Sequence, residues 1–68
     1  MNQKFFVWKY EEYEWAGRTE HKKVVQKKNL SLFEAYEVLG ELSKIYDEEN
    51  LGIEKMENIY LSIYVEEK

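Results

Sequence analysis

The chain has 68 residues, enough for one small hydrophobic core, so we expect a single domain over residues 1–68. Its 14 acidic residues outnumber its 10 Lys and Arg, and the resulting net charge of −4 disfavours the strongly basic class of nucleic-acid-binding domains. It contains no cysteine, which excludes disulfides, thiolate nucleophiles and cysteine-based zinc sites.

The same composition indicates where the protein works. A chain without cysteine fits a reducing compartment. The first apolar run, Phe5–Trp8, is far too short for the core of a signal peptide. No stretch approaches the ~18 consecutive apolar residues that a membrane-spanning helix needs. We therefore expect a cytoplasmic protein with no membrane partner.

Charge is unevenly distributed along the chain. Residues 18–30 contain five basic residues against one acidic residue, a net charge of +4. Residues 31–68 contain three lysines against ten acidic residues, a net charge of −7. Such a separation influences the choice of partner and the association rate more than the fold.

The first half of the chain predicts a β-hairpin. Aromatic residues and Val from Phe5 to about Trp15 favour a strand. Residues 16–18, Ala-Gly-Arg, are a turn signal because glycine adopts the positive φ angles that tight turns need. The stretch TEHKKVVQKK that follows, with Val24 and Val25 in its middle, predicts the antiparallel return strand.

Residues 8–15, WKYEEYEW, raise a question of side-chain direction within the first strand. Strict alternation would divide the four aromatic residues between two faces, Trp8 and Tyr10 on one and Tyr13 and Trp15 on the other. A β-bulge at Glu11–Glu12 would return all four to one face. We favour the bulged strand, because it adds an aromatic stripe to the core beneath the helix, mainly through Trp8 and Tyr10. Tyr13 and Trp15, near the hairpin tip, stay open as binding candidates.

The clearest predicted element is a helix that begins after Ser31. Ser31 and Glu34 have the S-x-x-E spacing of a capping box, in which each side chain binds a backbone amide at the helix start. Gly52 is the expected stop. Apolar residues recur with helical periodicity: Leu32, Ala35, Val38, Leu39, Leu42, Ile45 and Tyr46. Charged residues fall on the opposite face: Glu34, Glu37, Glu41, Lys44 and Glu48.

Residues 59–65, IYLSIYV, alternate in the manner of a strand with one buried face. The element order is then β-β-α-β, and a right-handed crossover places the third strand beside the first. We therefore expect an α+β fold: ββαβ, a three-stranded antiparallel sheet of order 2-1-3 with one helix packed on one face.

No motif predicts catalysis, a cofactor or a metal. His21 is the only histidine, and a hairpin turning at Ala16–Gly17 could place it opposite Glu12, which is an ordinary exposed cross-strand contact. Residues 47–50, DEEN, lack the alternating acids and the turn glycine of a calcium loop. No Gly-rich phosphate loop or H-E-x-x-H motif is present. We expect a protein with no enzymatic activity.

The aromatic content predicts a binding surface. One helix covers one face of a three-stranded sheet, so the far face would expose part of the 16% of residues that are aromatic. Exposed patches of this kind mark interfaces, and Tyr and Trp are typical interface anchors. The candidate partner-binding residues are Tyr60, Tyr64, Tyr13, Trp15, Glu11 and Glu12.

The functional expectation is protein binding by a small acidic inhibitor or adaptor that occludes its partner. Aromatic anchors would supply affinity, and the acidic residues would favour a basic, nucleic-acid-handling protein. Gly40, in the middle of the helix, could admit a close partner surface or make room for a neighbouring aromatic residue. Residue usage rich in Lys, Glu, Asn, Ile and Tyr, without Pro, suits an A/T-rich genome, and a small accessory protein of a phage or another mobile element is in keeping with that.

Two alternatives stay open. The stretch HKKVVQKK could neutralise nucleic-acid phosphates, with Tyr60 and Tyr64 as stacking platforms. Lysines on an edge strand, however, also protect against aggregation. The lysines concerned are Lys22, Lys23, Lys27 and Lys28. In the second alternative, the exposed aromatic patch joins two copies in a structural homodimer.

Overall fold

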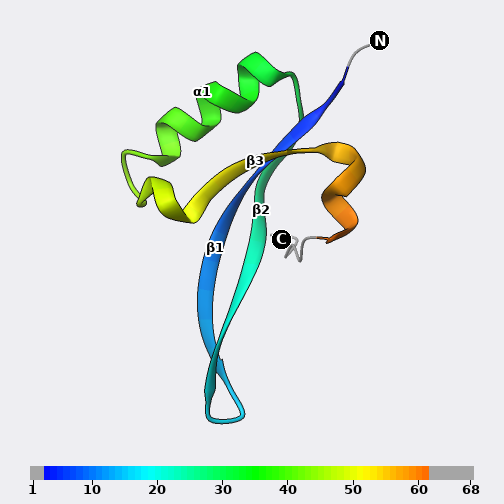
Figure 1. Ribbon diagram of the computed structural model, residues 1–68. Helices are drawn as coiled ribbons and strands as arrows, with labels where there is room; N and C mark the ends of the chain where they lie inside the picture. The colour runs from blue at the N-terminus through cyan, green and yellow to red at the C-terminus, as the bar shows by residue number, and fades with distance from the viewer. Residues whose placement is uncertain (1–2, 62–68) are drawn as a thin grey trace.

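The computed structural model describes residues 3–61, and at positions 13, 15 and 61 it describes the backbone alone (Figure 1). The strands form one antiparallel sheet of order β2-β1-β3, and the helix α1 contacts all three. This confirms the expected α+β fold with the first strand in the centre. The elements are β1 (Phe5–Trp15), β2 (Arg18–Leu30), α1 (Leu32–Leu42), the short 3-10 helix η1 (Glu48–Asn50), β3 (Leu51–Lys55) and the 3-10 helix η2 (Met56–Leu61).

The third strand lies earlier in the chain than the sequence predicted. Residues 59–61 belong to η2, and residues 62–65 lie outside the described part of the chain. The strand is instead Leu51–Lys55, in which Leu51 pairs with Lys9 and Ile53 pairs with Val7. This five-residue strand alternates apolar and small or charged residues over too short a length to stand out beside IYLSIYV.

The helix is shorter than predicted, but its start is as expected. The Ser31 hydroxyl accepts a hydrogen bond from the Glu34 amide at 3.1 Å, and the Ser31 amide donates to the Glu34 carboxylate at 2.9 Å. The helix ends at Leu42, so the prediction that Gly52 stops it was wrong: Gly52 lies inside β3. The residues of α1 that turn towards the sheet are Ala35, Val38, Leu39 and Leu42, which are buried or half-buried.

The hairpin turn has an uncommon residue at its first central position. Both central residues have positive φ, 54° at Ala16 and 79° at Gly17, the sign pattern of a type I′ turn. This turn matches the right-handed twist of the two strands. Glycine adopts such angles without cost, whereas alanine does so with steric strain.

The predicted bulge at Glu11–Glu12 was wrong. Pairing runs without interruption from Trp8 opposite Val25 to Trp15 opposite Arg18. The register shifts lie earlier in β1, between Phe5 and Val7 and between Val7 and Trp8, where β2 contains the extra residues. The local twist is therefore produced by β2, and β1 keeps strict alternation through residues 8–15.

That alternation assigns the two faces of the sheet. The side of Val7 and Lys9 faces α1, because Lys9 Nζ lies 4.4 Å from the ring centroid of Tyr46 in the turn after the helix. Phe6, Trp8 and Tyr10 are on the other face, so the expectation that Trp8 and Tyr10 form the core under the helix was also wrong. Among the side chains that the structure describes, the buried apolar ones are Phe6, Val7, Val24, Ala35 and Leu51.

The sheet has a three-stranded end and a two-stranded end. Strand β3 pairs with β1 only over Phe5–Lys9, so among the described residues only β2 pairs with β1 from Tyr10 to the hairpin turn (Figure 1). Beside the three-stranded end, η2 contacts β1 and β3. Phe6 is completely buried there although it faces away from α1, so this part of the second sheet face is not bare.

Candidate protein-interaction surface

The outer surface of α1 carries exposed apolar side chains. Phe33 is 73% exposed and Tyr36 is 61% exposed, and residues three apart are neighbours on a helix surface. Leu32, in the first turn beside them, is 46% exposed. These three residues form what we call the α1 surface, together with Gly40 one turn further on.

Gly40 leaves this surface open. A Cβ atom placed there would have no atom within 4 Å other than those of its own helix and chain neighbours. The backbone of α1 is therefore accessible at this point, and a partner could approach it more closely than at any residue with a side chain. Of the two explanations for Gly40 drawn from the sequence, an opening towards a partner fits this geometry, because no aromatic neighbour fills the space.

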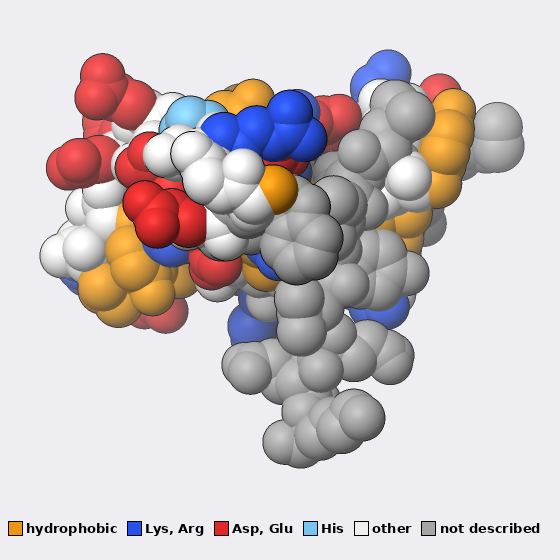
Figure 2. All heavy atoms as spheres, turned by 90° about the horizontal axis from the view of Figure 1, so that it is seen from below, with side chains coloured by type: hydrophobic (Ala, Val, Ile, Leu, Met, Phe, Trp, Pro, Cys, Tyr) orange, Lys and Arg blue, Asp and Glu red, His pale blue; other side chains and the backbone are white. Residues whose placement is uncertain are grey.

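Acidic residues flank the α1 surface. A shallow hollow of about 600 Å³ lies between α1 and the end of β2, and its lining combines acidic, aromatic and basic side chains: Lys27, Leu30, Glu34, Tyr36, Glu37, Val38, Gly40, Glu41 and Lys44. In the view from below, in which the hairpin turn is nearest the viewer and α1 is farthest, acidic side chains gather on the left with exposed hydrophobic side chains beside them, so the lower side of the molecule is acidic as well (Figure 2). Such a surface suits a partner that is both apolar and basic.

Glu34 has two roles in this arrangement. Hydrogen bonds from the backbone amide of Ser31, and then from its side chain, lower the pKa of the Glu34 carboxyl below its usual value of 4.5. A carboxylate near a helix N-terminus is also favoured by the helix dipole. Glu34 therefore stays ionised at neutral pH, where it both caps the helix and contributes negative charge.

On the opposite face of the sheet, aromatic rings hold a lysine. Trp8 and Tyr10 meet edge to face, with ring centroids 4.9 Å apart. Lys23 Nζ lies 4.5 Å from the Trp8 ring centroid and 2.7 Å from Glu54 Oε1. Because Lys23 is on β2 and Glu54 on β3, their ion pair bridges the central strand and ties the two outer strands together.

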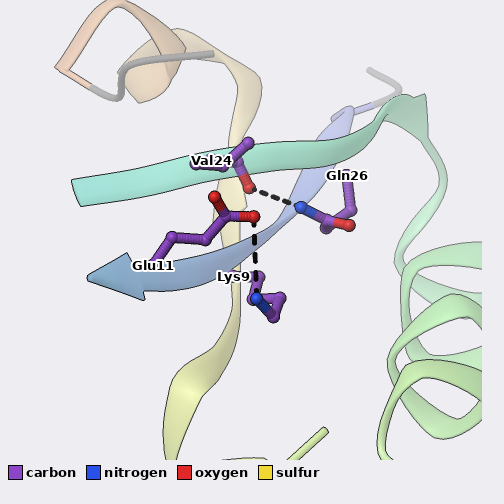
Figure 3. Close-up of polar contacts among 4 residues, drawn as sticks. All are labelled: Lys9, Glu11, Val24 and Gln26. Atoms are coloured by element: carbon purple, nitrogen blue, oxygen red, sulfur yellow. Dashed lines mark hydrogen bonds and ion pairs between the residues drawn. The ribbon is translucent and has the colours of Figure 1, made fainter. Parts of the chain in front are cut away.

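On the face of the sheet towards α1, the ion pair is longer than the one between Lys23 and Glu54. Lys9 Nζ lies 3.6 Å from Glu11 Oε2, two residues along the same face of β1, as Figure 3 shows. The same view shows the Gln26 side chain bonded to the Val24 carbonyl at 3.2 Å, in the irregular part of β2. Gln26 is the extra residue of β2 at the second register shift, and its side chain bonds back to the regular part of the same strand.

The expected contact between His21 and Glu12 is present. The two residues are cross-strand partners, and His21 Nε2 lies 3.2 Å from Glu12 Oε1. Their side chains are 59% and 66% exposed. Because both side chains are mostly exposed, the contact has the geometry of an ordinary cross-strand pair on the surface.

The four lysines proposed for nucleic-acid binding do not share one surface. Lys22 and Lys23 are consecutive in a regular part of β2, so they point to opposite faces of the sheet. Lys23 is half-buried in its ion pair with Glu54, and Lys27 pairs with Val7 on the face of α1. Lys28, near the irregular end of β2, is exposed.

The predicted partner-binding residues are scattered. Tyr60 is 76% exposed and belongs to η2 rather than to a strand, and Tyr64 lies outside the described residues. Tyr13 and Trp15 occupy β1 positions opposite Glu20 and Arg18 near the turn. Glu11 and Glu12 are engaged with Lys9 and His21.

The sequence held a signal for the α1 surface that the face-by-face reading did not use. Phe33 and Tyr36 fall outside the apolar stripe of the helix, on the side of the acidic residues. Two aromatic residues on the polar side of an amphipathic helix indicate a second apolar contact. Phe33 and Tyr36 have no place in the apolar stripe, so the pattern that predicts the core does not assign them.

Within residues 3–61, no group of three or more His, Asp or Glu side chains is placed to hold a metal ion. No helix of that part is long and apolar enough to cross a bilayer. Comparisons with protein-family models, with curated proteins and with solved structures find no match.

Proposed function

We propose that this protein binds another protein, without catalysis, as an inhibitor or adaptor, and that the α1 surface makes the contact. The observation that carries the proposal is the exposure of Phe33 (73%) and Tyr36 (61%) side by side on a helix that is otherwise acidic on its outer side. Neither residue contributes to the core, so their exposure costs solubility with no gain in folding.

The spacing supports binding of a helix in a groove. Phe33 and Tyr36 are three residues apart, one of the spacings of the anchors by which an amphipathic helix enters an apolar groove of its partner, and Gly40 leaves room beside them for the wall of the groove. Aromatic residues dominate the binding energy of such contacts. Occlusion is the mechanism: the α1 surface fills a site on the partner that another molecule would use.

Charge supports a basic partner. Glu34, Glu37 and Glu41 are exposed around the aromatic residues, and net acidic surfaces accelerate association with basic ones. A nucleic-acid-handling protein is one partner with this chemistry. The same acids disfavour a homodimer formed by two α1 surfaces, because they would face their own copies across the interface.

The test uses variants of the full chain as bait in a lysate of the cells in which the protein occurs and compares the proteins that each variant captures. Phe33→Ala/Tyr36→Ala should lose most of the captured partner, and because alanine favours helix the fold should be kept. Ile45→Ala and Tyr60→Ala are matched controls, since each removes an exposed apolar side chain outside the α1 surface. Equal capture by the double variant and wild type would refute the α1 surface as the binding site.

Nucleic-acid binding through the lysines of β2 is less well supported, because Lys22 and Lys23 point to opposite faces and Lys23 is paired with Glu54. A salt titration of fluorescence anisotropy with mixed-sequence oligonucleotides separates the two functions. Affinity that rises steeply at low salt would favour the lysines. An absence of affinity at low salt would remove this alternative.

A further inference from the structure

We propose a second binding site, at the free edge of β1 beyond the end of β3, that accepts an extended basic segment of another protein as an added strand. The site is independent of the α1 surface and consists of backbone groups rather than a side-chain pocket. Addition of a strand to an exposed sheet edge is a recurrent mode of peptide recognition, in which main-chain hydrogen bonds supply affinity.

The pairing pattern shows which backbone groups are free. In an antiparallel ladder, residues alternate between those bonded to the partner strand and those whose N–H and C=O point to the other edge. The two-residue turn Ala16–Gly17 makes Trp15 and Arg18 a bonded pair, so Tyr13, Glu11 and Lys9 are bonded to β2 as well. The outward set is therefore Trp8, Tyr10, Glu12 and Glu14.

Strand β3 uses only the first part of this outward set. Trp8 pairs with Gly52, and the pairing ends at the next residue, Lys9, with Leu51. The chain before Leu51 is in η1, which contacts β1 but is helical and forms no strand pairs with it. In residues 3–61, no strand pairs with this edge at Tyr10, Glu12 and Glu14.

A hollow marks the place where β3 would have continued. It has a volume of about 360 Å³ and is lined by residues of the hairpin and by the residue before β3: Lys9, Tyr10, Glu11, Glu12, His21 and Asn50. An antiparallel strand extended beyond Leu51 would pass through this position. The hollow therefore offers room for a backbone beside the free groups of Tyr10 and Glu12.

The two edges of the sheet differ in how they are protected. The outer edge of β2 has two register shifts and several lysines, both of which hinder strand addition. The edge of β1 from Tyr10 to Trp15 has a regular register and contains no lysine or proline. It is the more regular template of the two, and a strand can add to it without correcting a bulge.

Charge selects the occupant. Glu12 and Glu14 are exposed on one face of this edge, Glu11 lies on the other, and Asp47, Glu48 and Glu49 are exposed in the adjoining turn and η1. A second copy adding its own β1 edge would set these glutamates against one another, which is destabilising. A strand with Lys or Arg at alternate positions would place them beside Glu12 and Glu14.

Amide hydrogen exchange of the full chain, followed by NMR, tests the site directly. In the free protein, the amides of Tyr10, Glu12 and Glu14 should exchange faster than those of Glu11 and Tyr13, which β2 protects. Adding the peptide acetyl-Lys-Val-Lys-Val-Lys-Val-amide should protect the three fast amides. If these amides are already slow in the free protein, the edge is occupied and the proposal is wrong.

Two variants separate backbone pairing from charge attraction. Glu12→Pro removes an outward N–H and no bond to β2, so it should weaken peptide binding by about tenfold or more. Glu12→Gln/Glu14→Gln keeps the backbone groups and should weaken binding only a few-fold, with less dependence on salt. Circular dichroism checks that Glu12→Pro is folded. If this variant is unfolded, protection of the Tyr10, Glu12 and Glu14 amides of the wild type by the peptide is the deciding test.

The comparison peptide has Glu in place of Lys and should not bind. Equal binding of both peptides, or unchanged binding to Glu12→Pro, would overturn the proposal. Phe33→Ala/Tyr36→Ala should bind the Lys-Val peptide like the wild type, because the α1 surface is not involved. If the lysate experiment refutes the α1 surface, the proposed site at the β1 edge is therefore unaffected. If the Lys-Val peptide does not bind, the proposed role of the α1 surface is unaffected.

Discussion

The two ends of the hairpin are built from the same two strands yet are stabilised in different ways. At the three-stranded end, β1 has neighbours on both edges and packing on both faces, so Phe6 and Val7 are completely buried. At the two-stranded end, β1 has one described neighbour, and of its described side chains Tyr10, Glu12 and Glu14 are exposed. The change occurs within a few residues, between Lys9 and Tyr10, where β3 ends.

This difference separates stability from binding. Apolar burial, which supplies most of the free energy of folding, is concentrated around Phe6, Val7, Val24, Ala35 and Leu51. The hairpin beyond Lys9 and the outer side of α1 contribute little to it. Those two regions are therefore free to carry interaction surfaces, and substitutions there should change binding more than folding.

The largest expected effect comes from removing a side chain at the three-stranded end. Phe6→Ala should lower the free energy of unfolding by about 3–5 kcal/mol, because it leaves a cavity among rigid neighbours. The matched variant at the two-stranded end is Tyr10→Ala, on the same face of β1 and already 39% exposed. Tyr10→Ala loses mainly its contact with Trp8 and should cost about 1 kcal/mol.

Urea denaturation followed by circular dichroism measures both variants. Equal losses for Phe6→Ala and Tyr10→Ala would contradict the division into a stabilising end and an exposed end. A protein of this size has a small margin of stability, so Phe6→Ala should also be partly unfolded without denaturant.

The next largest effect concerns two glycines in opposite surroundings. A Cβ atom at Gly52 would overlap the indole ring of Trp8, which lies across the paired strands. Gly52→Ala should therefore destabilise the protein by about 1–3 kcal/mol through overpacking. Gly40→Ala meets open space and should stabilise α1 by about 1 kcal/mol, because glycine is unfavourable within a helix.

Thermal unfolding of the two variants distinguishes them by sign. A stabilising Gly52→Ala would show that the Trp8 ring moves without cost, and the close packing of β3 on the indole would lose its support. Trp8→Phe in the Gly52→Ala background should restore part of the loss, since a smaller ring leaves room for the added methyl group.

The sequence predicted the fold where a local signal agreed with the packing. The capping box of Ser31 and Glu34 located the start of α1, and the turn at Ala16–Gly17 located the hairpin and hence the His21–Glu12 pair. Both signals arise from neighbouring residues. The sheet order followed from the element order and the crossover rule, so it survived an error in the position of the third strand.

The errors came from features that depend on distant residues. From the sequence, Gly52 is a plausible helix stop. In the structure a glycine is required there because the indole ring of Trp8, far away in the chain, occupies the space of a Cβ atom. The doublet Glu11–Glu12 suggested a bulge, but the extra residues are in β2, where Gln26 bonds the Val24 carbonyl. Phe33 and Tyr36 are an exception, because their place outside the apolar stripe of the helix is already visible in the sequence.

A smaller and opposite effect is expected at the hairpin turn. Ala16 has a φ of 54°, and left-handed backbone costs an alanine roughly 1–2 kcal/mol that glycine avoids. Glycine also loses more chain entropy on folding, which offsets part of the gain. Ala16→Gly should therefore raise the free energy of unfolding by about 0.5–1 kcal/mol.

Gly17→Ala is the matched control for the turn, because it places a second Cβ at a positive φ of 79° and should destabilise the hairpin. Both changes lie far from α1 and β3, so they should leave the α1 surface unaltered. If Ala16→Gly lowered the stability, the type I′ geometry assigned to this turn would be wrong.

The smallest effect is a pH dependence at the start of α1. The pKa of Glu34 is below 4.5 in the folded protein, so its ionised form contributes stability above that value. This contribution is lost as the pH falls from about 4.5 through the lower folded pKa, because protonation weakens the carboxylate as an acceptor for the Ser31 amide. Glu34→Gln keeps an acceptor oxygen and should show a flatter stability profile across that window.

Urea midpoints at several pH values measure the difference between the stability profiles of the wild type and Glu34→Gln. Identical acid slopes would mean that the capping carboxylate is not held below its usual pKa, and the start of α1 would then depend on the Ser31 hydroxyl and on packing at Ala35.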